Sequence, residues 1–386
     1  MLDFDYSIST KVFFGKNRVG EIGEEIKKYS DRVLFAYGGA SIKNSGLYAV
    51  IINLLNKNKI TYEELSGIQP NPRIKSVREG VNLCRANKLR FILAVGGGSV
   101  IDCSKAIAAG IYYNADPWDF FAKKARVEKA LPLGTVLTLA ATGSEMNGFS
   151  VISNEETKEK LAMGNDLLRP KFSVLDPAYT FTVSKKHTAA GVVDIYTHIL
   201  EQYFCPVQGA YVQDKLAEGL IKVCLKYGHL AVKEPWNYEV RANLMWAGSL
   251  ALNGILTYGK IGDWAAHVIE HALSAVYDIT HGVGLAIIGP NWMEYVLDEK
   301  TAGKFAEYAK NVWGIESKDD FDAAKKAIAK TREFFRSLGM PVSLREVGIG
   351  DEKIEEMAKK AVVFGDIGNF RKLNTSDVVK ILRSAL

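Results

Sequence analysis

The chain has 386 residues, of which 48% are hydrophobic and 24% charged, and its formal net charge is +5. This length exceeds one ordinary core and predicts two domains, whereas the mixing of Lys and Arg with Asp and Glu gives no indication of nucleic acid binding. No stretch approaches the ~20 apolar residues of a membrane span, and the N-terminus fits neither a secretory signal nor a transit peptide. We therefore expect a cytoplasmic protein. Its four cysteines lack paired spacing, so we expect reduced thiols.

Between residues 32 and 175, short apolar runs alternate with amphipathic stretches that begin at glycine turns. Examples are RVLFAY before GGASIKNSG, RFILAV before GGGSVIDCSKAIAAG, and LPLGTVLTLAA before TGSE. Strands rich in Val, Ile and Leu, each followed by a turn and a helical pattern, are typical of a parallel sheet covered by helices. The sequence therefore predicts an α/β domain with a Rossmann-like parallel sheet over residues 1–180.

A dinucleotide phosphate site is indicated where RFILAV runs into Gly96, Gly97 and Gly98, and Ser99 opens a helix. Glycines let the backbone approach an anion, and the N–H groups at the helix start point towards it. The pattern is neither GxGxxG nor a Walker loop, and a plain strand-to-helix turn remains the alternative. Farther on, TLAATGSEMN groups side chains that could bind phosphate or ribose, or could simply cap a turn: Thr138, Thr142, Ser144 and Asn147.

After the turn-rich DPAYT junction at residues 176–180, the pattern changes. Residues 181–386 keep a 3.6-residue period and have few β-branched clusters, which predicts an all-helical second domain.

Two segments of this second domain predict a metal site. In GVVDIYTHILE, Asp194 and His198 lie four apart on one helical face. In HVIEHALSAVYDITHG, His267 pairs with either His271 or His281, and His281 could reach the same ion only if the chain turned back. One carboxylate oxygen with imidazole nitrogens suits Fe²⁺ or Zn²⁺ and not calcium.

The HVIEH segment also fits a different chemistry. It matches the HxxEH pattern of inverted zinc peptidases, in which Glu270 would be the general base of a metal-dependent hydrolase. That interpretation leaves Asp194 and the glycine turn unused. The remaining histidines, His187 and His229, are expected to be structural or exposed.

Together these motifs resemble the iron-containing (group III) alcohol dehydrogenase family, and within it the butanol dehydrogenase and aldehyde reductase branch. The resemblance runs through the chain in order: KVFFG, YGGASIKNSG, IQPNPR, GGGSVIDCSK, ATGSEMN, DPAYTFT, GVVDIYTHILEQY, ALNG and DWAAHVIEHALSAVYDITHG. It implies the dehydroquinate synthase-like fold of that family, with an N-terminal dinucleotide-binding domain, a C-terminal helical metal domain and an active site in the cleft between them.

The resemblance also implies roles for individual residues. The metal ligands would be Asp194, His198, His267 and His281, while His271 would lie beside the substrate or nicotinamide. The glycine turn would hold the pyrophosphate. The implied cofactor-binding residues are Gly38, Gly39, Ser41, Asn71, Gly96, Gly97, Gly98, Ser99, Asp102, Thr138, Thr142, Ser144, Asn147, Lys160 and Tyr179.

The implied reaction is hydride transfer between NAD(P)H and a primary alcohol/aldehyde pair such as butanol/butanal. The ion would act as a Lewis acid on the substrate oxygen, and His271 would either relay a proton or shape the pocket.

The turn after the first strand bears on cofactor preference. The strand is followed by Gly38, Gly39, Ala40 and Ser41, with no acid to repel a 2′-phosphate. We therefore expect NADP(H) to be preferred over NAD(H). The motifs also leave open a glycerol-dehydrogenase-like polyol oxidoreductase or, if no metal binds, a nonredox binding protein. A homodimer is expected.

Overall fold

The computed structural model describes all 386 residues, which divide into two compact units. The first, called here the α/β unit, comprises Ser7–Val183 and Pro235–Asn253. The second, the helical unit, comprises Met1–Tyr6, Ser184–Glu234 and Gly254–Leu386. The sequence predicts two continuous ranges, 1–180 and 181–386. The structure differs from these ranges at two segments. Met1–Tyr6 belongs to the helical unit, and Pro235–Asn253 belongs to the α/β unit.

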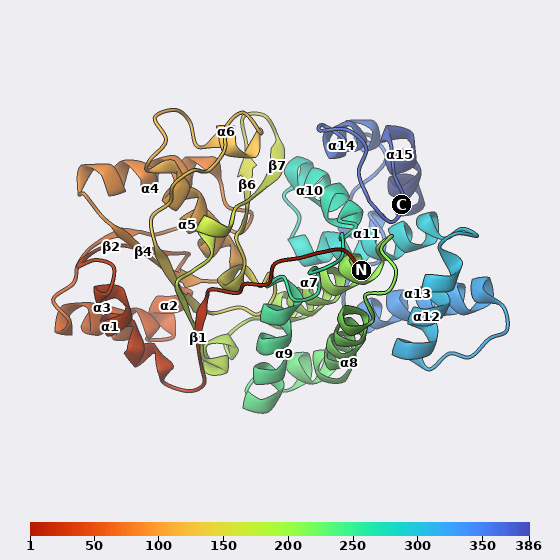
Figure 1. The fold of residues 1–386 in the computed structure, drawn as a ribbon, viewed down its shortest axis with the longest axis horizontal. Helices are drawn as coiled ribbons and strands as arrows, with labels where there is room; N and C mark the ends of the chain where they lie inside the picture. Colours follow the sequence, from red (N-terminus) through yellow and green to blue (C-terminus); the bar gives the residue numbers. More distant parts are fainter. The chain divides into compact units, whose positions relative to one another are not determined.

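A six-stranded parallel sheet forms the centre of the α/β unit, in the order β1-β8-β5-β4-β2-β3 (Figure 1). Its strands are β1 (Lys11–Phe14), β2 (Arg32–Tyr37), β3 (Thr61–Leu65), β4 (Phe91–Gly96), β5 (Leu133–Leu137) and β8 (Phe172–Leu175). An antiparallel pair, β6 (Phe149–Asn154) and β7 (Glu159–Gly164), stands apart from it. The parallel sheet confirms the predicted fold class for this half.

Two hydrophobic clusters cover opposite faces of the sheet, because alternate residues of each strand point in opposite directions. On β2, Leu34 and Ala36 pack with α4 (Ile74–Ala86) and α5 (Gly98–Gly110). Val33 and Phe35 of the same strand pack with α1 (Ile22–Lys27) and α3 (Leu47–Lys57). The sheet is therefore doubly wound. The unit also contains α2 (Ser41–Asn44), α6 (Trp118–Phe121), α9 (Tyr238–Ala251) and the short 3₁₀ helices η1 (Arg18–Glu21), η2 (Ser144–Met146), η3 (Asp166–Leu168) and η4 (Pro177–Thr180).

The helical unit contains no strand, which confirms the all-helical prediction. Its helices are α7 (Lys185–Tyr203), α8 (Tyr211–Lys233), α10 (Ala265–Tyr277), α11 (His281–Val296), α12 (Ala302–Trp313), α13 (Asp320–Ser337), α14 (Ile354–Ala361) and α15 (Thr375–Ser384), with the 3₁₀ helix η5 (Arg345–Val347). Helix α7 packs against α8 and α11, and α10 packs against α11 and α14. Nearly every residue of α7 after its first turn is buried, so this helix is the centre of the unit.

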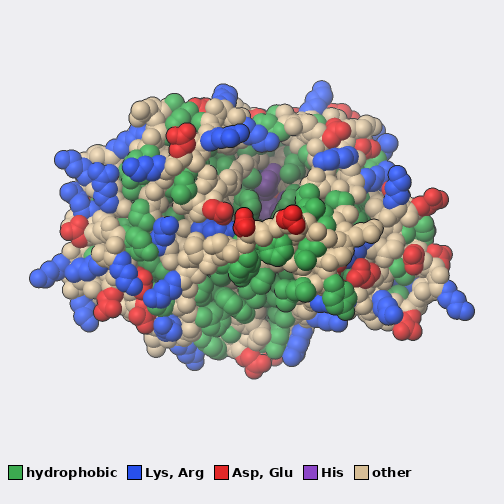
Figure 2. Space-filling view, viewed as in Figure 1, with side chains coloured by type: hydrophobic (Ala, Val, Ile, Leu, Met, Phe, Trp, Pro, Cys, Tyr) green, Lys and Arg blue, Asp and Glu red, His purple; other side chains and the backbone are tan.

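No helix is both long enough and apolar enough to cross a membrane. On the face shown in Figure 2, Lys and Arg side chains are interspersed with Asp and Glu.

Candidate metal and nucleotide sites

Three helices of the helical unit bring the predicted metal residues together. Asp194 and His198 lie one turn apart on α7, and His267 is in the first turn of α10. Helix α10 ends at Tyr277, Asp278 adopts a left-handed conformation (φ 51°), and α11 begins at His281. The chain thus turns back after α10, which is the reversal that His281 requires to reach the cluster.

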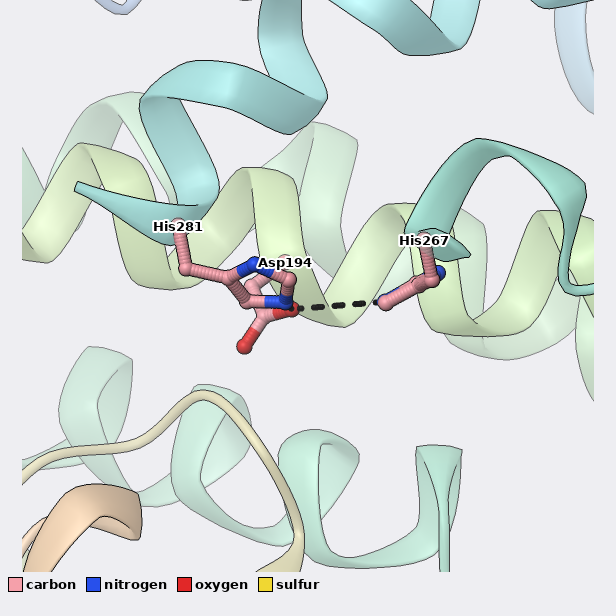
Figure 3. Close-up of side chains that lie close together, drawn as sticks. All are labelled: Asp194, His267 and His281. Carbon is pink, nitrogen blue, oxygen red and sulfur yellow. Dashed lines mark ion pairs between the residues drawn. The ribbon is translucent and has the colours of Figure 1, made fainter. Parts of the chain in front are cut away.

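The three histidines converge on one carboxylate oxygen of Asp194. Oδ1 of Asp194 lies 3.5 Å from Nδ1 of His198, 3.8 Å from Nε2 of His267 and 3.5 Å from Nε2 of His281. Figure 3 shows His281 of α11 and His267 of α10 on either side of a dashed line that marks the approach to Asp194 of α7. Donors at the corners of a tetrahedron with metal–ligand bonds of about 2.1 Å lie about 3.4 Å apart. The ligand atoms of Asp194, His267 and His281 all lie within 4.8 Å of one another and so suit a single ion, and His198 lies next to this group through Asp194.

Several of these atoms have no hydrogen-bond partner although they are buried. They are Oδ1 of Asp194, Nδ1 of His198 and Nε2 of His267. Buried polar atoms in native proteins are almost always satisfied, and an unmet set that faces one point is what an ion would satisfy. The residues present therefore fit a divalent metal.

The electrostatics of the cluster also favour a cation. Burial acts to raise the pKa of Asp194, but His198, His281 and His267 outweigh it and hold that pKa well below its usual range. Burial lowers the pKa of His198 to about 3, which leaves this imidazole neutral and able to bind a metal. Burial also acts to lower the pKa of His267, but Glu201 and Asp194 raise it to about 9. The buried carboxylates of Asp194 and Glu201 therefore favour positive charge beside these imidazoles.

Two buried glutamates contact the imidazole ligands. The sequence interpretation assigned no role to Glu201, and assigned Glu270 only that of a general base in the hydrolase alternative. A carboxylate oxygen of Glu201 bonds with Nδ1 of His267, and one of Glu270 bonds with Nδ1 of His281. Both glutamate residues have no exposed surface. A carboxylate on the second nitrogen of a ligand histidine fixes its tautomer and its ring orientation. The signal in the sequence was a glutamate three residues after a ligand histidine, in HILE and in HVIE.

Two further rings border the cluster. His271 is partly exposed, and its ring centroid lies 5.5 Å from that of His281 and 6.4 Å from that of His267. Trp264 precedes α10 in a left-handed conformation (φ 67°), and its ring lies 5.6 Å from that of His267. A bulky residue rarely adopts this conformation, and such strain is concentrated at functional sites.

In the α/β unit, the predicted cofactor residues collect at the carboxyl edge of the sheet. Tyr37 is paired with Val95 and Gly96 with Leu137, so the turns after β2, β4 and β5 lie at one edge. Gly38 and Gly39 follow β2, Gly97 to Ser99 follow β4, and Thr138 follows β5. Ligands of open α/β sheets bind at this edge.

The glycine turn is packed closely enough that side chains would not fit. A Cβ on Gly98 would lie 2.4 Å from Oγ1 of Thr142, and one on Gly97 would lie 3.1 Å from Cβ of Leu139. Gly97 is extended before α5 and has no side chain with which to cap the helix. The first N–H groups of α5 thus remain available to an anion, as a pyrophosphate site requires.

A fully buried lysine, which was not predicted as part of this site, fixes the neighbouring turn. Nζ of Lys105 donates to Oγ of Ser144 (2.8 Å), Oδ1 of Asn147 (2.9 Å) and the carbonyl of Phe149 (2.8 Å). Oγ of Ser144 in turn donates to Asp102 at 2.5 Å. Ser144, Asn147 and Asp102 therefore hold the turn to α5.

The other predicted cofactor residues lie in three places. Ser41 opens α2, and Tyr179 lies on η4, packed against the hydrophobic cluster of the α1 and α3 face. Lys160 on β7 is paired with Ser153, which also bridges to Arg73. Asn71, two residues before Arg73, is buried and left-handed (φ 50°). The hairpin therefore brings Lys160 close to the NPR turn.

Comparisons with known proteins agree with this geometry. The family model described as iron-containing alcohol dehydrogenase matches residues 9–177, and the model of the Fe-containing alcohol dehydrogenase family, C-terminal, matches residues 188–386. The chain is 56% identical to the NADH-dependent butanol dehydrogenase A of Clostridium acetobutylicum, over all of both chains. It is 40% identical to the NADPH-dependent aldehyde reductase of Escherichia coli, over 93% of each chain.

A solved structure shows the same likeness. The crystal structure of NADH-dependent butanol dehydrogenase A from Thermotoga maritima superposes with a TM-score of 0.97 at 41% identity, and covers 100% of this chain and 99% of that one.

Proposed function

The chain belongs to the iron-containing alcohol dehydrogenase family, and we propose from this premise that it interconverts a primary alcohol and its aldehyde, such as butanol and butanal. It is a metal-dependent, nicotinamide-linked oxidoreductase. The observation that carries the proposal is the approach of three imidazole nitrogens to within 3.5–3.8 Å of one oxygen of Asp194. Asp194, His198, His267 and His281 are the proposed ligands of one divalent ion, Fe²⁺ or Zn²⁺.

When bound, the ion supplies Lewis acidity at the substrate oxygen, and the nicotinamide supplies or accepts the hydride. The protein's own contribution at the metal is orientation. Burial keeps His198 neutral, and Glu201 and Glu270 hold the other two imidazoles in place. Next to these ligands, the partly exposed His271 is the proposed proton relay, because an imidazole can accept and release a proton near neutral pH.

The nucleotide is proposed to bind at the carboxyl edge of the parallel sheet. The glycine turn and the start of α5 would hold the pyrophosphate through backbone N–H groups. Thr138 and Thr142 flank that turn, while Asn71 and Lys160 come from the NPR turn and the β6–β7 hairpin.

NADP(H) is proposed to be preferred over NAD(H). The turn after β2 has no acid, and Nζ of Lys43 lies 5.5 Å and 5.0 Å from the ring centroids of Tyr37 and Tyr48. The nearby carboxylate of Glu64 accepts hydrogen bonds from both tyrosine hydroxyls. Relatives are named for either nucleotide, so the measurement is the ratio of kcat/KM for NADPH to that for NADH. A Lys43→Ala variant should lower this ratio, and a wild-type preference for NADH would contradict the proposal.

The hydrolase alternative is disfavoured by the position of Glu270. Its carboxylate has no exposed surface and bonds with His281 and Ser274. A general base must reach a water molecule, and this carboxylate is occupied instead. A polyol substrate is tested in the oxidative direction, by comparing glycerol with butanol as the alcohol that reduces NADP⁺.

The deciding experiment follows absorbance at 340 nm with butanal and NADPH, before and after metal removal and after readdition of Fe²⁺ or Zn²⁺. His267→Ala should lose the metal and about 10³-fold of kcat/KM, since Lewis acid catalysis contributes several kcal/mol. His187→Ala is the matched control, because His187 is exposed on the same helix that carries Asp194. Full activity without metal would refute the proposed function.

A homodimer and a cytoplasmic location are also proposed. Light scattering tests the oligomeric state, and cell fractionation tests the location.

A further inference from the structure

A short pattern, His-x-x-Glu, occurs twice in the helical unit. The first copy is His198 to Glu201 on α7, and the second is His267 to Glu270 on α10. In each copy the histidine belongs to the candidate metal cluster. The glutamate lies three residues later in each copy. It contacts the ligand histidine of the next helix.

Glu201 of α7 contacts the first residues of α10. One oxygen accepts from the backbone N–H of Ala266 (2.7 Å), and the other accepts from the backbone N–H of His267 (3.2 Å) and bonds with its Nδ1. The residue before α10, Trp264, provides no side-chain cap. Glu201 therefore caps the helix from outside it, where a negative charge is favourable, and orients the ligand ring by the same contact.

Glu270 of α10 contacts the first residue of α11 in a similar way. One oxygen bonds with Nδ1 of His281, the first residue of α11, and the other with Oγ of Ser274. Thr280, the residue before α11, provides no side-chain cap either. Gly284 leaves the space that the glutamate fills, because a Cβ there would lie 2.7 Å from Cγ of Glu270.

We propose that the two His-x-x-Glu pairs form a relay of positioning residues, in which each helix supplies one metal ligand and the carboxylate that orients the ligand of the next helix. The order is α7 to α10 to α11. In the metal-bound protein, Nδ1 of His267 and of His281 would each donate to a glutamate. Nε2 of each ring, which lies 3.8 Å and 3.5 Å from Oδ1 of Asp194, would then carry no hydrogen. This inference rests on the proposed metal site and assigns roles to Glu201 and Glu270.

The relay predicts different tolerances to a Glu→Gln change. Both oxygens of Glu201 accept hydrogen bonds, and two of the donors are backbone N–H groups that cannot move away. In Glu201→Gln, the NH₂ that replaces one oxygen would therefore face a donor and lose that hydrogen bond. If the NH₂ faces His267, it favours the tautomer with hydrogen on Nε2, which cannot bind a metal. Glu270 differs, because the hydroxyl of Ser274 can accept from an amide and donate to the carbonyl of Ile279 (3.2 Å). Glu270→Gln can therefore keep an oxygen on His281.

The experiment measures the affinity of the full chain for Co²⁺ by chelator competition, together with the visible spectrum of the bound ion. Glu201→Gln should weaken binding by about 100-fold and shift the cobalt bands, whereas Glu270→Gln should weaken it by at most about 10-fold. Glu270→Ala, which removes the acceptor from His281, should match Glu201→Gln. Glu218→Gln is the control, because Glu218 is a buried, hydrogen-bonded glutamate of the same unit that contacts Tyr203, Lys215 and Asn311.

Wild-type cobalt affinity and an unchanged spectrum in Glu201→Gln or Glu270→Ala would overturn the relay, as would an equal loss in Glu218→Gln. If Glu201→Gln fails to fold, the comparison of Glu270→Ala with Glu270→Gln tests the relay. Only the relay predicts that the glutamine variant keeps the cobalt affinity that the alanine variant loses. Absence of cobalt binding by the wild type would overturn the relay together with the metal site. Cobalt binding without aldehyde reduction would contradict only the proposed reaction.

Discussion

Replacing Gly282 with alanine should damage the metal site without touching a ligand. Gly282 follows His281 at the start of α11, which packs on α7. A Cβ at this position would lie 2.1 Å from the carbonyl oxygen of Ala190, 2.6 Å from its carbonyl carbon and 2.9 Å from its Cα. These are backbone atoms one turn before Asp194, so no side-chain rotation can relieve the clash.

The required movement can be worked out from these distances. Real Cβ contacts start near 3.0 Å, so the two helices must separate by at least about 0.9 Å at this point. Metal–ligand distances tolerate only about 0.2 Å, and the shift would carry His281 away from the ion. Overpacking of this kind costs about 1–3 kcal/mol.

The assay for Gly282→Ala is urea unfolding of the metal-free protein, combined with Co²⁺ affinity. Gly289→Ala is the matched control on the same helix, because its nearest neighbour is Cε2 of Phe335 at 4.0 Å. That change should leave cobalt binding intact, because it pushes on no backbone of α7. Equal stability and equal cobalt affinity in the two variants would refute the reasoning.

Three other outcomes are expected. Gly98→Ala should weaken NADPH binding by about 10-fold in a fluorescence titration without changing cobalt affinity, because its Cβ would push Thr142 away from the glycine turn. Burial lowers the pKa of Lys105 to about 8 from 10.5, so the folded chain releases this proton before the unfolded chain does. The unfolding free energy should then rise by up to about 3 kcal/mol between pH 8 and 10.5, and Lys105→Met should lose that rise in urea titrations. Burial raises the pKa values of Cys84 and Cys224 to about 12, so both thiols should react with a disulfide reagent at pH 8 only after unfolding.

The sequence was sufficient to predict the sheet and to place Asp194 and His198 on one helical face, because these signals are local. Apolar runs such as RFILAV, each followed by a glycine turn, indicate parallel strands, and the four-residue spacing of Asp194 and His198 places both on one helical face. The choice between His271 and His281 as a partner of His267 depends on the reversal at residues 278–280. Spacing alone left that choice open, and the structure places Nε2 of His281 3.5 Å from Asp194.

The contacts of the glutamates and of Lys105 could not be predicted from local pattern. A glutamate or lysine on a helix usually faces solvent. Glu201 and Lys105 are buried because the start of α10 and the turn at residues 144–149 pack over them, and both packings join segments distant in sequence. The placement of α9 depends on long-range contacts for the same reason. Ser249 of α9 bonds with buried Glu145 of η2. The amphipathic pattern of α9 does not predict which distant residue its side chains will contact.

The most direct test of the central claim is a crystal structure of the metal-loaded protein, with anomalous scattering measured at the absorption edge of the bound ion. We predict one strong peak at about 2.0–2.2 Å from an oxygen of Asp194 and from one nitrogen each of His198, His267 and His281. A peak held instead by the neighbouring group of Glu270, His271 and His281, or no peak among these helices, would contradict the account.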